Sequence, residues 1–128
     1  MAQLIYKILT PMSAAPFFAE GALTPSGVDA ADGYVHFSTA EQLVETLDKH
    51  YAGYDDLVLL AVDAHDCGAD LRWELSRNEE RFPHLYAILR VDMVQAHMQL
   101  NAARDGLQTW LAELASLADT DVTIRGAG

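Results

Sequence analysis

Three short segments of the chain place polar or aromatic side chains at every second position. Because successive side chains of a β-strand point to opposite faces, each segment would present these side chains on a single face. The residues concerned are Tyr34, His36 and Ser38 in the first segment, Arg72 and Glu74 in the second, and His84 and Tyr86 in the third. If the three faces coincide, the side chains line a pocket with groups for hydrogen bonding and proton transfer.

The chemistry predicted for such a pocket is recognition of a small anion. Arg72 could hold a phosphate or carboxylate through two parallel hydrogen bonds. The alternative is that these faces are the solvent side of an antiparallel sheet, where polar residues normally alternate with core residues. In that case Arg72 and Glu74 form a surface ion pair, which contributes at most about 1 kcal/mol.

Other reaction types have weaker support in the sequence. His36, Glu74 and His84 match the residue types of a two-histidine, one-carboxylate metal site, but they lack close ligand spacing, so no metal is predicted. The triplet His65–Cys67 lies in a loop that contains Gly and Asp. Neighbours in sequence seldom supply the geometry of a Cys-His nucleophile. The motifs GxxxxGK[ST], GxGxxG and GxSxG do not occur.

The strands that must hold these residues are predicted from runs and alternations of apolar residues. The run Leu57–Val62 is apolar throughout, as in a central strand covered on both faces. The first strand should stop at Thr10–Pro11, because proline cannot donate a ladder hydrogen bond. The complete set of predicted strands is Leu4–Leu9, Tyr34–Ser38, Leu57–Val62, Leu71–Leu75, His84–Val91 and Val94–Leu100.

Three helices are predicted between and after these strands. The first ends at Glu20 before Gly21, with Pro16 either in its first turn or at a kink. A loop with at most one helical turn follows over residues 22–33. The second helix begins near residue 39, with Ser38 and Glu41 as its capping box. The last helix covers about residues 105–118.

These elements predict one α+β domain over residues 1–128, with a flexible glycine-rich end at 126–128. Its helices and strands do not follow a regular βαβ alternation. We expect the helical stripes and the buried strands to share one core. The core residues predicted on this basis are Leu43, Val44, Leu47, Leu59, Ala61, Leu71, Trp73, Trp110, Leu111 and Leu114.

The composition limits the classes of partner. The chain has 19 acidic against 8 basic residues and a formal net charge of -11. Such a surface repels nucleic-acid backbones and anionic lipids, so neither is predicted as a partner, although a small anion can still bind locally. The single cysteine, Cys67, allows no internal disulfide. The chain lacks a secretion-signal pattern and a long apolar segment, so a cytoplasmic location is expected.

Four blocks of sequence, taken in order, resemble a known family. They are Asp32–Gln42, Leu57–Asp63, Leu71–Glu74 and Phe82–Tyr86. Together they look like the bacterial domain-of-unknown-function family catalogued as number 952, and the resemblance spans roughly residues 4–100. That family is in turn similar, at the level of fold and remotely, to the ADP-ribosyltransferase group, which binds NAD in a cleft of a split β-sheet.

The resemblance implies a mixed split sheet for this chain and NAD as a possible cofactor. It implies catalytic roles for His36, as the strand histidine that holds the nicotinamide ribose, and for Glu74, as the glutamate that stabilises an oxocarbenium-like transition state. The remaining pocket residues, Tyr34, Ser38, Arg72, His84 and Tyr86, would bind the ligand. Two functions stay open: an enzyme or nucleotide-binding protein that uses NAD or ADP-ribose, and a non-enzymatic module that binds a small anion or a partner peptide. The oligomeric state is not predicted.

Overall fold

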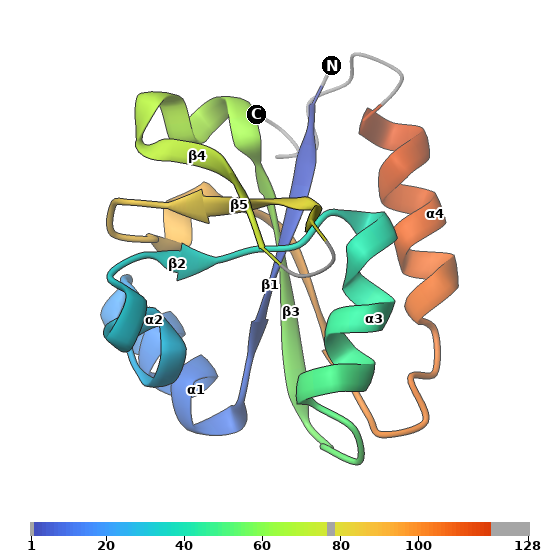
Figure 1. Cartoon of the computed structure of the whole chain (residues 1–128). Coiled ribbons are helices and arrows are strands. Elements are labelled where there is room, and N and C mark those ends of the chain that lie inside the picture. Colours follow the sequence, from blue (N-terminus) through green and yellow to red (C-terminus); the bar gives the residue numbers. More distant parts are fainter. Residues whose placement is uncertain (1, 77–78, 119–128) are drawn as a thin grey trace.

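The fold is built from two three-stranded antiparallel sheets, which lie across one another in Figure 1. The computed structural model describes residues 2–76 and 79–118. The first sheet has the order β1-β3-β6 and the second β2-β5-β4. Their strands are β1 (Leu4–Leu9), β2 (Val35–His36), β3 (Leu57–Asp63), β4 (Leu71–Leu75), β5 (Arg81–Leu85) and β6 (Val94–Leu100). The predicted α+β class with a split sheet is confirmed, while the glycine-rich end at 126–128 lies outside the described residues.

The helices cover the two faces of the first sheet. They are α1 (Pro11–Glu20), α2 (Gly27–Asp32), α3 (Ala40–His50) and α4 (Leu107–Ala118), with 3-10 turns η1 (Ala64–Asp70) and η3 (Val91–Met93). In Figure 1, α3 and α4 stand together on one side of β1 and β3, and α1 and α2 lie on the other. No helix in the described part of the chain is long and apolar enough to cross a membrane.

Strand β3 is central and buried on both faces, as its continuous apolar sequence predicted. Its alternate side chains enter two different hydrophobic clusters: Leu60 lies in the cluster beside α1, and Leu59 in the cluster beneath α3 and α4. Most of the residues predicted to belong mainly to one core share the second cluster: Leu43, Leu47, Leu59, Ala61, Leu111 and Leu114 lie in it and Trp110 packs against it, while Val44 is in neither cluster. Leu71 and Trp73 pack against the first cluster, whereas the buried stripes of α3 and α4 belong to the second.

The capping box of α3 differs by one residue from the prediction. Thr39 is the N-cap, and its hydroxyl accepts a hydrogen bond from the backbone N–H of Gln42 at 3.2 Å. The Gln42 side chain accepts in return from the Thr39 N–H at 3.1 Å. Both Ser38 with Glu41 and Thr39 with Gln42 fit the motif by sequence. The second pair caps the helix because Ser38 is occupied in a β-bridge to Tyr6.

Three other segments depart from the predicted elements. The strand predicted over Tyr34–Ser38 is shortened to β2, Val35–His36. Residues 27–32 form α2, a six-residue helix, in the region predicted as a loop. The strand expected over His84–Val91 instead covers Arg81–Leu85. Beyond Leu85 the backbone turns away and bonds to the α1–α2 connection, with Leu89 accepting from Leu23 and Val91 donating to Gly21, both at 2.9 Å.

The two sheets meet at a single point and then separate. The edge strand β1 and the segment just after β2 are joined by an antiparallel bridge in which Tyr6 and Ser38 exchange backbone hydrogen bonds of 2.8 and 2.9 Å. Away from this bridge, each strand pairs only with the other members of its own sheet. The divergence opens a gap between Lys7 on β1 and His36 on β2, and this gap holds the candidate site.

Candidate functional site

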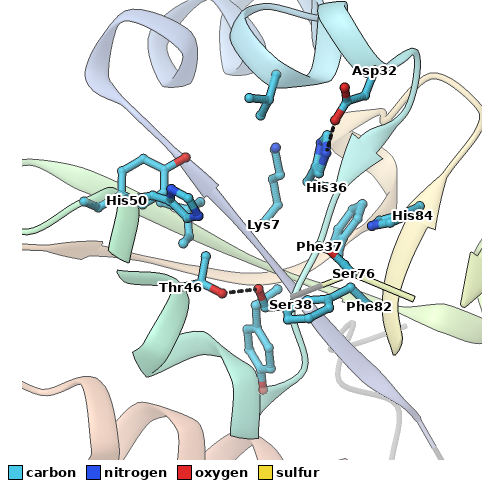
Figure 2. Close-up of a pocket in the computed structure, with 14 residues that line it drawn as sticks. Lys7, Asp32, His36, Phe37, Ser38, Thr46, His50, Ser76, Phe82 and His84 are labelled. Atoms are coloured by element: carbon cyan, nitrogen blue, oxygen red, sulfur yellow. Dashed lines mark hydrogen bonds and ion pairs between the residues drawn. The ribbon is translucent and has the colours of Figure 1, made fainter. Parts of the chain in front are cut away.

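A cavity of about 480 Å³ lies where the two sheets diverge. Its wall is built from β1, α2, β2 and the two residues after it, α3 with the residue after it, the residue after β4, and β5. The lining residues are Tyr6, Lys7, Ile8, Val28, Asp32, His36, Phe37, Ser38, Thr46, His50, Tyr51, Ser76, Phe82 and His84. Figure 2 shows Lys7 near the middle of this group, with His50 on one side and His36 on the other. A volume of this size lies in the range of small-molecule sites.

An ion-paired chain joins β1, α2 and β2 at the cavity wall. The Lys7 Nζ lies 2.7 Å from Asp29 Oδ2, and both side chains are buried. The second oxygen of Asp29 lies 2.6 Å from His36 Nδ1 and accepts the His36 backbone N–H at 3.1 Å. On the other side of the ring, His36 Nε2 lies 3.0 Å from Asp32 Oδ2. The short helix α2 thus fixes the orientation of His36 through two carboxylates.

Burial and pairing act in opposite directions on this chain. For Lys7, burial outweighs the attraction of Asp29 and lowers the pKa of the ammonium below its usual value. For Asp29, burial alone would raise the pKa, but the hydrogen bond from His36 and the charge and hydrogen bond of Lys7 lower it overall. Asp29 is therefore held ionised, with its two oxygens shared between a lysine and a histidine.

Glu74 lies behind the cavity wall and supports His84. Its Oε1 lies 2.9 Å from His84 Nδ1 and accepts the Tyr86 hydroxyl at 2.7 Å. The hydrogen bonds from Tyr86 and His84 keep the pKa of Glu74 below its usual value. His84 is only 3% exposed. Because a carboxylate accepts hydrogen bonds, this contact places a proton on Nδ1 of His84.

Aromatic rings connect His36 with the residues around Glu74. Tyr34 lies over His84 with ring centroids 4.1 Å apart, and it also contacts His36 at 4.5 Å and Tyr86 at 5.0 Å. The Arg72 guanidinium carbon lies 4.4 Å from the centre of the Tyr86 ring, a distance at which a cation is attracted to the ring face. Side chains from β2, β4 and β5 are thus in continuous contact.

The register explains why these side chains meet. His36 pairs with His84 across β2 and β5, and His84 pairs with Arg72 across β5 and β4, so all three share one face. Glu74 follows two residues after Arg72 on the same face. His36, Arg72, Glu74 and His84 therefore lie on one face of the second sheet, and Glu74 bonds to His84. That all four form one concave site stays a prediction, because only His36 and His84 line the cavity. That they bind a ligand stays a prediction.

Only some of the predicted site residues line the cavity. His36, Ser38 and His84 line it, whereas Tyr34, Arg72, Glu74 and Tyr86 are not among its lining residues. The buried hydroxyl of Ser38 lies 3.1 Å from that of Thr46, and the dashed line in Figure 2 marks this contact between β2 and α3. The residues that line the cavity and those that do not are nevertheless linked, because Glu74 bonds to His84.

Four basic and acidic residues of the site lie outside the β2-β5-β4 sheet and were not predicted from the sequence: Lys7, Asp29, Asp32 and His50. A signal for Lys7 was present, because it is the one charged residue in the strand sequence LIYKIL. A lysine within an apolar strand is rarely buried without a partner. No sequence pattern identified Asp29 as that partner.

A metal centre finds no support in the described residues. Within residues 2–76 and 79–118, no group of three or more His, Cys, Asp or Glu side chains is arranged to hold a metal ion. His36 pairs with Asp29 and Asp32, while His84 pairs with Glu74. The histidines that a metal would need are thus bonded to separate carboxylates.

Comparison with known proteins identifies the family. Residues 8–97 match the family described as "Protein of unknown function (DUF952)". The chain belongs to this family. The match includes every cavity residue from Ile8 onward, whereas Tyr6 and Lys7 on β1 precede it.

Solved structures of one bacterial protein share the fold. The X-ray crystal structure of protein CC0527 from Caulobacter crescentus is 46% identical over 85% of this chain and 98% of that one, with a TM-score of 0.79. The solution NMR structure of CC0527 is 46% identical over 77% and 85% of the two chains, with a TM-score of 0.70. No curated protein matches the chain. The likeness to ADP-ribosyltransferases stays a prediction.

Proposed function

We propose that this DUF952 protein binds a small anionic molecule in the cavity between its two sheets. The observation that carries the proposal is the gathering of basic side chains there. Of the five histidines in the sequence, His36, His50 and His84 line the cavity, together with Lys7. In a chain with a net charge of -11, such a local concentration favours an anionic ligand.

The anion is proposed to lie near His50 and to reach inward toward His84. The charge of Lys7 is already matched by Asp29, and both nitrogens of His36 face carboxylates. His50 is exposed at the end of α3 and borders the cavity. It is therefore the basic lining residue best placed to meet a phosphate or carboxylate first.

NAD and ADP-ribose are the first ligands to test, because the resemblance to ADP-ribosyltransferases suggests them. The arrangement of Glu74 favours binding over turnover. A catalytic glutamate must touch the reacting atoms, whereas Glu74 bonds to Tyr86 and His84 and does not line the cavity. We therefore propose a binding protein as the function, with a transferase or hydrolase acting on NAD as the alternative.

Thermal unfolding in the presence of ADP-ribose, NAD and inorganic phosphate tests the proposal. A ligand that binds only the folded state at 100 times its Kd adds about 2.7 kcal/mol to stability. The shift should be reduced in His50→Ala and retained in His65→Ala, which removes a histidine outside the cavity. If none of the three anions raises the melting temperature at millimolar concentration, anion binding is wrong. Release of nicotinamide from NAD would support the enzyme instead.

A further inference from the structure

Lys7 is a buried primary amine that faces the cavity. It lies in β1 between the buried residues Tyr6 and Ile8, and only 7% of its surface is exposed. In Figure 2 its amine points into the space between His50 and His36. A lysine in such a place has its carbon chain packed in the core, while its nitrogen can be reached from the cavity.

The surroundings of Lys7 supply the other groups that amine chemistry needs. Asp29, 2.7 Å from Nζ, can accept the ammonium proton. His36 shares the same carboxylate at 2.6 Å and also lines the cavity, so Lys7, Asp29 and His36 form one hydrogen-bonded chain at the cavity wall. Burial lowers the pKa of Lys7, and this favours the neutral, nucleophilic amine.

We propose that Lys7 forms an imine with an aldehyde or ketone group of a small anionic molecule in the cavity. Asp29 takes one proton from the Lys7 ammonium, and the freed nitrogen lone pair attacks the carbonyl carbon as the carbonyl π electrons move to oxygen. Asp29 returns this proton to the oxygen and then takes a second proton from the nitrogen, which gives a neutral carbinolamine. The nitrogen lone pair expels the hydroxyl, which leaves as water with the proton held by Asp29, so the product is a protonated imine beside the ionised Asp29 carboxylate. One carbonyl and one amine give one imine and one water, with no change of oxidation state. That the ligand is an anion is taken from the proposed function.

The sequence makes a direct test possible, because Lys7 and Lys49 are its only lysines. Lys49 is half exposed on α3, 3.6 Å from Glu45, and serves as the internal reference. The protein is incubated with glyoxylate, an anionic aldehyde, and sodium cyanoborohydride, which reduces an imine to a stable secondary amine. Peptide mass spectrometry then measures the label at each lysine and at the N-terminal amine.

The expected result is labelling of Lys7 at least about ten times faster than Lys49 in the folded protein, with similar rates in urea. A barrier difference of about 1.4 kcal/mol corresponds to this ratio. Labelling of Lys49 and the N-terminus with Lys7 unmodified would overturn the proposal. Since the rates are measured on the unaltered chain, the result does not depend on a variant that folds. Lys49→Arg should leave the label at Lys7 unchanged, and Lys7→Arg should abolish it.

Two further outcomes distinguish imine formation at Lys7 from anion binding in the cavity. If acetaldehyde, which is neutral, labels Lys7 as fast as glyoxylate, the imine stands and the preference for an anion is wrong. If ADP-ribose or phosphate raises the melting temperature but glyoxylate leaves Lys7 unlabelled, the anion site stands and the imine is wrong.

Discussion

Replacement of Asp29 by Asn tests the ion-paired chain that orients the cavity wall. Asn keeps the volume of the side chain and an oxygen that can accept the His36 backbone N–H. It removes the charge that pairs with Lys7, whose side chain is 9% exposed, against 7% for that of Asp29. Loss of one partner from a buried pair leaves an uncompensated charge and costs about 3–5 kcal/mol.

Asp29→Asn is therefore expected to lower the free energy of unfolding by about 3 kcal/mol. This is a large share of the roughly 5–15 kcal/mol by which a typical domain is stable. Urea unfolding followed by the fluorescence of Trp73 and Trp110 measures this loss of stability. An unchanged slope of the unfolding free energy against urea concentration indicates that the fold is intact. Asp32→Asn is the matched control. Asp32 pairs with the same histidine but is 47% exposed, so its loss should cost at most about 1 kcal/mol.

The ion pair of Asp29 also predicts how stability depends on pH. The pKa of Asp29 is lower in the folded protein than its ordinary value of 3.8, so the folded state binds the proton less tightly than the unfolded state. The stability that Asp29 contributes is then complete above pH 3.8 and is lost as the pH falls through the folded pKa. The difference in stability between the unaltered chain and Asp29→Asn should shrink over that interval. A loss no larger than that of Asp32→Asn, or a difference independent of pH, would refute the buried ion pair.

Three further predictions concern the elements around the site. Thr39→Ala should cost about 0.5–2 kcal/mol in urea unfolding because it removes the N-cap of α3, whereas Glu41→Ala should stay within about 0.5 kcal/mol. On α4, Leu114→Ala should cost about 2–5 kcal/mol, and Leu117→Ala much less, because Leu114 is 5% and Leu117 42% exposed. Burial raises the pKa of Cys67 to about 11, so its thiol should react with a disulfide reagent at pH 8 far more slowly in the folded protein than in urea. Equal rates would contradict its burial.

Much of the secondary structure was predictable because the apolar patterns are unambiguous. The bounds of β1, β4 and β6 agree with the prediction, and α4 starts two residues later than expected. The errors arose where the local sequence is compatible with two alternative structures. Ser38 and Thr39 can both cap a helix, and only the bridge from Ser38 to Tyr6 decides between them. The end of β5 depends likewise on distant backbone partners in the α1–α2 connection.

The candidate site was predictable only within one sheet. Alternation along β2, β4 and β5 placed His36, His84 and Arg72 on a common face, and the antiparallel register aligns them. Alternation within a sheet cannot reveal which strand of another sheet will face it. Lys7 enters the site because β1 meets β2 at Tyr6 and Ser38, a contact between segments that are far apart in the chain.

The split between the sheets also explains why the polar groups of the cavity can be buried. Two paired strands would satisfy their backbone groups and close the gap, leaving no space for side chains between them. Because β1 and β2 separate after one bridge, Lys7 and His36 can turn into the opening, and α2 supplies the carboxylates that compensate them. A longer pairing of β1 with β2 would remove the cavity without changing any residue that lines it. The site is therefore a property of the strand arrangement, and its chemistry depends on Asp29 as much as on the residues that a ligand would touch.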